Sequence, residues 1–259
     1  GVHDLARSLD TLGPLARSVA DAARVLEVIS GPDGGSAVRP QFKAATALAM
    51  DVRGWKVAVL PMEAMPAIDP QVAELYQAAV GALAALGVEI ETARTPRPFA
   101  DYFIPNGWLM AAEGWRVRGP HIATNGELMD RWVVKRFEAG RSVTDAELAR
   151  ALARRAADQR EFQDWMAPYG ALLSPTLPIP APPIEDVDET ASPFSAMTRA
   201  GNNLNLPAAS VPMGLTDGGL PAGLQIMGRM ADEASVVALA AAYEAVSGWN
   251  GRRPDLSAF

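Results

Sequence analysis

Cysteine is absent from this sequence, and histidine and lysine are scarce. The 259 residues contain two histidines, His3 and His121, and three lysines. Without cysteine, the chain has no disulfide, no thiol nucleophile and no thiolate metal ligand. Two distant histidines, with no HExxH or EF-hand pattern, predict no metal site. We therefore expect neither a bound metal nor a cofactor.

The usual catalytic patterns are also missing. The sequence has no Gly-x-Ser-x-Gly elbow, and none of Lys43, Lys56 and Lys135 follows a serine by three positions. Neither histidine has a serine or an aspartate in a recognised arrangement, so both are interpreted as surface or hydrogen-bonded residues. Glu113 is interpreted as a capped or paired carboxylate. We predict that this chain holds no catalytic residue.

The sequence also lacks a net positive charge and long apolar runs. The net charge of −7 argues against a nucleic-acid partner, which would require a basic patch. No apolar run is long enough to span a membrane, and the N-terminus has no signal-peptide core. We therefore predict no membrane partner and a cytoplasmic location. A composition of 49% hydrophobic and 20% charged residues is typical of a globular protein with a sizeable core.

The patterns that are present alternate between strand and helix. Residues 56–60, KVAVL, are typical of a strand, and residues 88–93, VEIETA, of a second one. Between them, Asp69 and Pro70 are the cap and first residue of a helix. This strand–helix–strand order predicts two parallel strands joined by a right-handed crossover.

Other elements lie on both sides of this unit. Ser18 is expected to cap a helix that is followed by a Gly-rich and Ala-rich connection to about residue 53. The residues that fall on one face of this helix at helical spacing are Val19, Ala22, Ala23, Leu26 and Ile29. Thr144 and Glu147 form a capping box for a helix that ends before Pro168.

The C-terminal third predicts strands and one helix. Residues 171–174 have the composition of a buried strand, and a loop is expected before residue 208. Residues 208–213 and 219–228 predict two strands around a turn at Asp217-Gly218, and a final helix begins at Asp232. The proline-rich stretch from Pro178 to Pro183 is interpreted as a rigid loop edge, with a polyproline ligand for an SH3-like partner as the alternative.

Residues 96–167 differ from the rest, because they carry four of the six tryptophans and are expected to be helical. We predict an α/β fold over residues 1–259, with a mixed β-sheet flanked by helices and a helical, pocket-lining insertion at about 96–167. The aromatic cluster between Tyr102 and Trp115 is interpreted mainly as core, with a pocket lining as the alternative.

Three blocks of sequence resemble the C-terminal part of the amidase signature family. They are SLDTLGPLARSVADAARVLEVISGPD, ALLSPTLPIPAPP and NNLNLPAASVPMGLTDGGLPAGLQIMGRMADEASVVALAAAYE, which occur in the family's order and span nearly the whole chain. The chain departs from the pattern at Asn205, where the family commonly has glycine, and at Gly170, where it has aspartate. Residues 96–167 match the family in helical character but hardly in motif.

The resemblance implies hydrolysis of carbon–nitrogen (amide) bonds by a Ser–Ser–Lys triad. In that family a lysine acts through a bridging serine to activate a nucleophilic serine in a Gly/Ser-rich loop. No position of this sequence matches those residues, which would lie upstream of Gly1. We therefore expect a C-terminal part of an amidase that is inactive alone and shapes the pocket for a small-molecule amide.

The resemblance also suggests four substrate-binding residues, by approximate alignment: Asn106, Trp108, Pro178 and Ile179. The expected partner is the missing N-terminal portion of the same protein, and self-association into a homo-oligomer is the expected consequence of its absence. Two alternatives remain open: a naturally truncated, non-catalytic binding or scaffold protein, and an unrelated α/β small-molecule binder.

Overall fold

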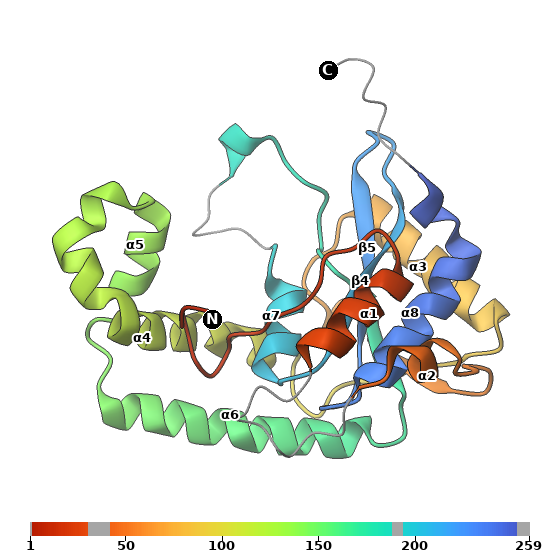
Figure 1. Ribbon diagram of the computed structural model, residues 1–259, viewed down its shortest axis with the longest axis horizontal. Coiled ribbons are helices and arrows are strands. Elements are labelled where there is room, and N and C mark those ends of the chain that lie inside the picture. Colours follow the sequence, from red (N-terminus) through yellow and green to blue (C-terminus); the bar gives the residue numbers. More distant parts are fainter. Residues whose placement is uncertain (1, 31–41, 188–193, 253–259) are drawn as a thin grey trace.

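The computed structural model describes residues 2–30, 42–187 and 194–252 of the chain. Within them, five strands form one mixed sheet in the order β2-β1-β3-β5-β4. The strands are β1 (Lys56–Val59), β2 (Glu89–Thr92), β3 (Ala171–Pro175), β4 (Ala208–Leu215) and β5 (Pro221–Met227). The predicted α/β class and mixed sheet are confirmed (Figure 1).

The predicted strand–helix–strand unit forms as expected. β1 pairs in parallel with β2, and α3 (Pro70–Ala85) connects them. The Asp69 side chain accepts hydrogen bonds from the first two free backbone amides of α3, which explains why the helix begins there. Gly87 then turns the chain into β2 with a positive φ of 88°.

The C-terminal hairpin also forms, but with an order that the sequence does not reveal. β5 pairs antiparallel with both β3 and β4, so the later strand lies inside the sheet and β4 forms its edge. The turn contains the predicted Asp217-Gly218, closed by a hydrogen bond from the Thr216 amide to the Leu220 carbonyl. All five residues of β3 are buried, because strands cover both of its edges and side chains cover both of its faces.

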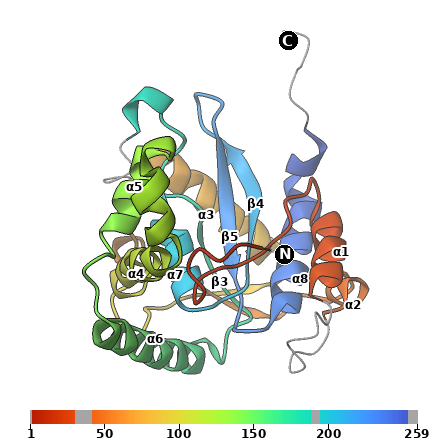
Figure 2. The ribbon, with the colours of Figure 1, turned by 60° about the vertical axis from the view of Figure 1, so that its left-hand side comes forward.

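Helices cover the sheet on two sides (Figure 2). On one side α8 (Glu233–Ser247) contacts α1 (Val19–Ile29), α2 (Ala44–Leu48) and α3. On the other side α7 (Ala196–Asn203) lies between the sheet and α4 (Ala100–Asn125). The predicted helical insertion consists of α4, α5 (Arg131–Glu138) and α6 (Asp145–Met166). Short 3-10 turns occupy Met62–Ala64, Gly126–Leu128, Ile184–Asp186 and Trp249–Gly251.

Two details of the predicted elements are wrong. Residues 44–48, assigned to a connection, form α2, whose buried Ala44 and Ala47 pack against α8. Residues 196–203, assigned to a loop, form α7, which packs along α4. Ile29 lies in the last turn of α1, and 48% of its surface is exposed.

The core explains most of the aromatic residues in the insertion. Phe99 and Tyr102 are buried at the start of α4, where their rings contact each other, and the Tyr102 ring also packs against Phe162 of α6. This confirms that the front of the aromatic cluster is core. Trp108 differs, because 39% of its surface is exposed, and it lies on a different part of α4.

Candidate functional site

A cavity of about 350 Å³ lies between α4 and α5. Its walls include Trp108 of α4 and Trp132 of α5, and Lys135 and Arg136 lie along α5 beside them. Positions 132, 135, 136 and 139 recur every three or four residues, so they share one face of α5. The cavity therefore has flat aromatic walls and a cationic side.

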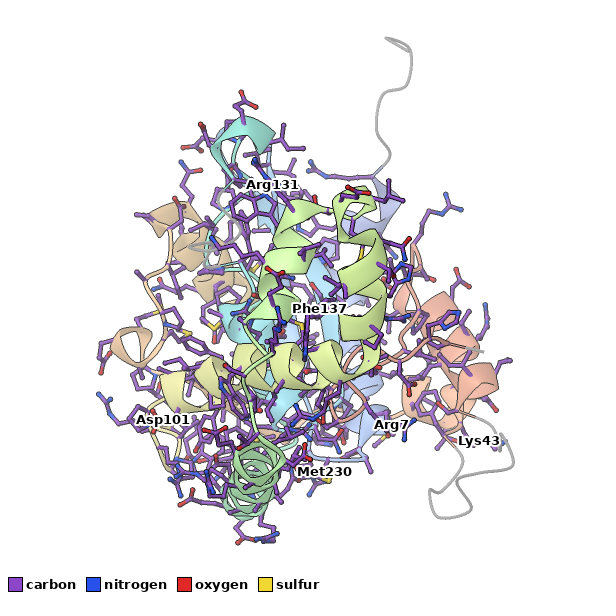
Figure 3. All side chains as sticks on the ribbon, turned by 90° about the vertical axis from the view of Figure 1, so that its left-hand side faces the viewer. Arg7, Lys43, Asp101, Arg131, Phe137 and Met230 are labelled. Carbon is purple, nitrogen blue, oxygen red and sulfur yellow. The ribbon has the colours of Figure 1, made fainter. Side chains whose placement is uncertain are left out.

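Small residues on α4 allow α5 to approach closely beside this cavity. A Cβ added at Gly114 would lie 2.5 Å from a ring carbon of Phe137, and one at Gly140 would lie 2.0 Å from the carbonyl oxygen of Ala111. Figure 3 shows Phe137 against α4, with Arg131 further along α5. The glycines thus fix the spacing of the two helices that form the cavity.

Arg199 of α7 lies beside a wall residue of the same cavity. Its Nη1 atom is 3.8 Å from the position that a Cβ would take on Gly107, a residue of the cavity wall. The side chain is half-buried, and burial together with the charge of Arg136 lowers the pKa of Arg199. Among the described residues, no carboxylate lies within ion-pair distance of this guanidinium.

Asn106 is buried next to the wall residue Gly107 and holds three segments together. Its Nδ2 donates a hydrogen bond of 2.8 Å to Oδ1 of Asn202 on α7. Asn202 in turn donates to the carbonyl of Leu9, at 2.7 Å, and to the hydroxyl of Thr11, at 3.3 Å. Both amide groups are engaged in binding α4, α7 and the N-terminal segment to one another.

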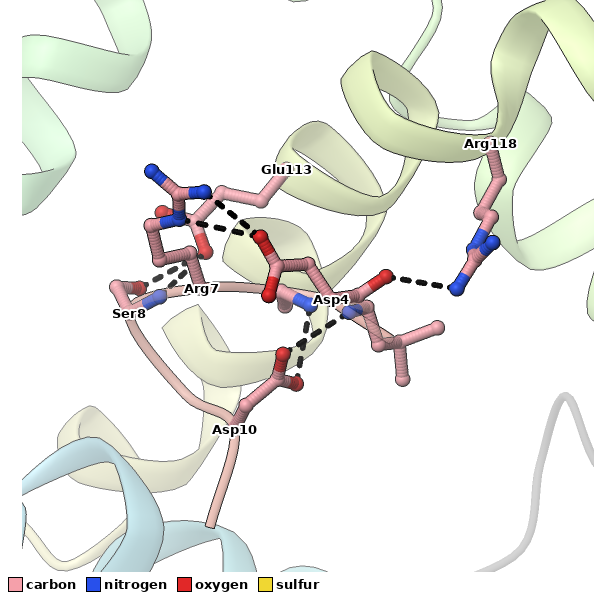
Figure 4. Close-up of polar contacts among 8 residues, drawn as sticks. Asp4, Arg7, Ser8, Asp10, Glu113 and Arg118 are labelled. Atoms are coloured by element: carbon pink, nitrogen blue, oxygen red, sulfur yellow. Dashed lines mark hydrogen bonds and ion pairs between the residues drawn. The ribbon is translucent and has the colours of Figure 1, made fainter. Parts of the chain in front are cut away.

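Glu113 fixes the same N-terminal segment to α4 (Figure 4). The backbone amide and the hydroxyl of Ser8 both donate to its Oε2 atom at 3.0 Å. Arg118 donates to the carbonyl of Asp4 at 2.9 Å, further along the same helix. Glu113 is thus capped by hydrogen bonds from Ser8, which agrees with its interpretation as a capped or paired carboxylate.

The other two predicted site residues lie elsewhere, in the loop that follows β3. The carbonyl of Pro178 accepts a hydrogen bond of 2.9 Å from the amide of Asp69, which ties this loop to the start of α3. Pro178 is buried and Ile179 partly buried, and neither lines the cavity between α4 and α5. Of the four predicted site residues, only Trp108 lines the cavity, Asn106 is next to its wall residue Gly107, and Pro178 and Ile179 belong to the loop after β3.

Three strands meet at the start of this loop. The hydroxyls of Thr176 and Ser210 lie 2.6 Å apart, and Gly223 of β5 lies between them in the sheet. A Cβ on Gly223 would approach both hydroxyl oxygens within 3.0 Å. Glycine at this position therefore allows two polar side chains to meet across the strand.

A second cavity, of about 480 Å³, lies beyond the carboxyl ends of β1 and β2. Its charged side chains are matched internally. Arg94 pairs with Glu63, and Arg97 pairs with Glu161 and lies 3.5 Å from Asp158. Because Arg97 already forms ion pairs with carboxylates of the chain, this cavity is a weaker candidate for binding a charged ligand.

The lysines and histidines of the described chain have non-catalytic contacts. Lys43 pairs with Glu27 at 3.4 Å, Lys56 pairs with Glu91 at 3.2 Å, and Lys135 lies over the ring of Trp132. His121 Nδ1 lies 3.3 Å from the side-chain amide of Asn125. Residues 2–30, 42–187 and 194–252 thus contain no lysine or histidine hydrogen-bonded to a serine hydroxyl.

Neither a metal cluster nor a membrane span occurs in the described part of the chain. Histidine, aspartate and glutamate side chains nowhere gather in a group of three that would hold a metal ion there. In the same ranges, every helix is too short or too polar to cross a membrane.

Comparison with protein families matches residues 1–237 to the family described as Amidase. The chain belongs to the amidase signature family. The resemblance of the three sequence blocks is thereby confirmed.

Curated relatives of this amidase-family chain are only about 30% identical to it. A glutamyl-tRNA(Gln) amidotransferase subunit of Brevibacillus brevis is 30% identical over 98% of this chain and 58% of its own length. The protein of the same name from Desulforamulus reducens is 32% identical over 99% of this chain and 59% of its own length. The chain therefore spans less than two thirds of the relatives it matches.

Solved structures of the family match the fold. The glutamyl-tRNA(Gln) amidotransferase subunit of the same name from Thermotoga maritima superposes with a TM-score of 0.77 at 27% identity, covering 96% of this chain and 56% of that one. A structure described as a vestigial protein complex that reveals the origins of an s-triazine catabolic enzyme reaches 0.82 at 21% identity, covering 95% and 55%. The second likeness concerns the fold alone.

The family resemblance indicates Trp108 but not the other residues around the cavity. Trp132, Lys135 and Arg199 are not predicted from the sequence, because α5 and α7 are not delimited there. A helix beginning after Asp130 places Trp132 and Lys135 on one face, so the helix cap is the signal that could have found them. Arg199 lies next to Gly107, although the two residues are about ninety positions apart in the sequence. No local sequence pattern indicates this contact.

Proposed function

We propose that this chain forms the pocket-shaping part of an amide hydrolase that works by a Ser–Ser–Lys mechanism, with the triad in polypeptide outside residues 1–259. The observation that carries this proposal is the family match over residues 1–237. It is supported by the contacts of Lys43, Lys56 and Lys135, which join carboxylates or an indole ring and no serine hydroxyl.

The chemistry explains why the remaining polypeptide is needed. Amide hydrolysis requires a hydroxyl nucleophile activated by an adjacent base, and backbone donors aimed at the developing oxyanion. The described residues offer a cavity with aromatic walls and a cationic side but no such serine–base pair. Residues 1–259 by themselves are therefore inactive in our proposal.

Two features support contact with further polypeptide of the same protein. β4 has a sheet partner on one side only within the described residues, which leaves an edge to which another strand can pair. Apolar side chains also face solvent on α1 and the segment before it, where Leu15 is fully exposed and 79% of Val28 is exposed. We propose that this polypeptide covers these surfaces, and that homo-oligomers form when it is absent.

We assign the four predicted site residues different tasks in this proposal. Trp108 is a pocket wall, and Asn106 positions the wall through Asn202. Pro178 and Ile179 shape the loop after β3, which Asp69 holds in place. The substrate is a small-molecule amide, and a cytoplasmic location stays a prediction.

A non-catalytic small-molecule-binding protein is the second candidate. The observation that favours it is that every described residue lining the cavity belongs to α4, to α5 or to the position directly after α5. The two candidates differ in turnover. A non-catalytic binding protein in its intact form binds amides but never hydrolyses them.

Turnover by two preparations separates these candidates. The intact protein and isolated residues 1–259 are each incubated with a series of aryl and alkyl amides, and the release of ammonia or amine is measured. We expect hydrolysis by the intact protein alone. Hydrolysis by the isolated 259 residues overturns the assignment of the triad to other polypeptide, and binding without turnover by the intact protein establishes the second candidate.

A further inference from the structure

The α4–α5 cavity is positively charged on a protein that is negatively charged overall. The net charge of the sequence is −7, yet Lys135 lines the cavity, none of its described lining residues is acidic, and Arg199 lies beside the wall residue Gly107. A cationic cavity whose walls carry no carboxylate lowers the free energy of a bound anion.

Arg199 is the most informative of these residues. A half-buried guanidinium without a carboxylate partner among the described residues costs stability, because it loses hydration and gains no ion pair in return. The neighbouring charge of Arg136 adds to that cost. The guanidinium of Arg199 is therefore available to form an ion pair with an anion from outside the described chain.

The aromatic walls restrict the shape of that anion. Trp108 and Trp132 present flat apolar surfaces, and the volume of about 350 Å³ is at the small end of the range for ligand sites. Lys135 lies 5.4 Å from the centre of the Trp132 ring, so the cationic group and the flat surface belong to the same part of the cavity. A planar body next to a carboxylate matches this arrangement.

We propose that the α4–α5 cavity binds the carboxylate end of a small planar amide substrate. Arg199 and Lys135 engage the carboxylate, and Trp108 and Trp132 lie along the planar body. This inference rests on the proposed amide hydrolase activity and adds the substrate class: amides that also carry a carboxylate.

Binding of two matched probes tests the site without requiring turnover. The anionic probe is 4-carbamoylbenzoate and the neutral one is benzamide, each titrated into the intact protein by calorimetry at low salt. We expect the anionic probe to bind at least tenfold more tightly, since hydrogen bonds to charged groups contribute most of the difference. Equal affinity for the two probes overturns the proposal.

Three single-site variants locate the charge that matters. Arg199→Gln and Lys135→Gln should each weaken binding of 4-carbamoylbenzoate about tenfold and leave benzamide binding unchanged. Arg131→Gln is the matched control, because Arg131 is on the same helix as Lys135 and also contacts Trp132 but does not line the cavity. Equal weakening by Arg131→Gln and Lys135→Gln would show only a general effect of charge and would overturn the site.

Thermal unfolding separates a binding role for Arg199 from a structural one. Because this guanidinium has no carboxylate partner within the described residues, Arg199→Gln should unfold at the same temperature as the wild type or a higher one. A lower unfolding temperature together with lost binding would show that Arg199 has a structural role. The comparison of Lys135→Gln with its control Arg131→Gln would then decide the proposal. Selective binding of 4-carbamoylbenzoate without hydrolysis of any amide would leave the site standing and remove the hydrolase function.

Discussion

Individual glycines set how closely the helices around the cavity approach. Gly140 is buried against the backbone of α4, where an added Cβ would lie 2.0 Å from the carbonyl oxygen of Ala111. Backbone atoms cannot move aside as the end of a long side chain can, so this contact is more restrictive than the one between Gly114 and Phe137. The close approach of α4 and α5 therefore depends on the absence of a Cβ atom at these two glycines.

Gly140→Ala should destabilise the protein by about 3 kcal/mol, because overpacking against backbone forces α5 away from α4. Urea denaturation monitored by tryptophan fluorescence measures the change. Gly81→Ala is the control: Gly81 lies on the exposed side of α3 with nothing within 4 Å of an added Cβ. That substitution should stabilise by about 0.5–1 kcal/mol, and destabilisation by both variants to the same extent would contradict the packing argument.

The capping box of α6 is a second effect at the residue scale. The Thr144 hydroxyl accepts a hydrogen bond from the Glu147 amide, and the Glu147 carboxylate accepts one from the Thr144 amide. Thr144→Ala should cost about 1 kcal/mol of stability, measured by urea denaturation. Thr144→Ser keeps the hydroxyl and should cost much less, so equal losses for the two substitutions would rule out the cap as the cause.

At the scale of elements, α3 and β3 are joined by a buried phenol. The Tyr76 hydroxyl donates a hydrogen bond of 3.0 Å to the carbonyl of Leu173, and burial raises the pKa of Tyr76. A group whose pKa is raised on folding stabilises the protein fully below its unfolded pKa, near 10 for tyrosine. That contribution is lost as the pH rises above about 10 towards the folded-state value.

Tyr76→Phe should therefore change the free energy of unfolding in two ways, which depend on the pH. Below about pH 9 it should lower the free energy of unfolding by about 1 kcal/mol through loss of the hydrogen bond. Between about pH 10 and 11.5 the variant should lose stability less steeply than the wild type, because one buried ionisable group is gone. Urea denaturation at a series of pH values measures both, and parallel pH curves for the two proteins would contradict the assignment.

At the scale of the whole molecule, the uncovered surfaces decide how the isolated chain behaves. Exposed apolar side chains on and before α1 include Leu15 and Val28, and β4 has an open edge within the described residues. Such surfaces favour association when nothing covers them.

Isolated residues 1–259 should self-associate at micromolar concentration, and the double substitution Leu15→Ser and Val28→Ser should lower the mean mass seen by light scattering. Ile184→Ser is the matched control, because 88% of the Ile184 side chain is exposed on a separate surface. A monomeric wild-type chain, or an equal effect of the control, would count against these surfaces as the interface.

Local signals in the sequence predict most individual elements. The cap at Asp69, the capping box at Thr144 and the turn at Asp217-Gly218 act within a few residues, so they can be recognised from the sequence. Helix α7 is not predicted, because its N-cap side chain makes no hydrogen bond and the helix depends on packing against α4.

The candidate site is harder to predict for the same physical reason. The family resemblance indicates Trp108, whereas Lys135 and Arg199 come from different helices and meet around one cavity only in the folded chain. Asn106 is expected from the resemblance to contact substrate, which stays a prediction, and its side chain donates a hydrogen bond to Asn202 in the described structure. Sequence alignment locates a residue on a helix, but it does not reveal what lies opposite.

The sequence by itself determined the family, the strand–helix–strand unit and the absence of a recognised catalytic motif, because caps, turns and motifs depend on neighbouring residues. Only the tertiary structure decided that β5 lies inside the sheet, that α4 and α5 line one cavity, and that Arg199 lacks a carboxylate partner among the described residues. These features depend on contacts between segments far apart in the chain, whose energies arise only when the whole core is packed.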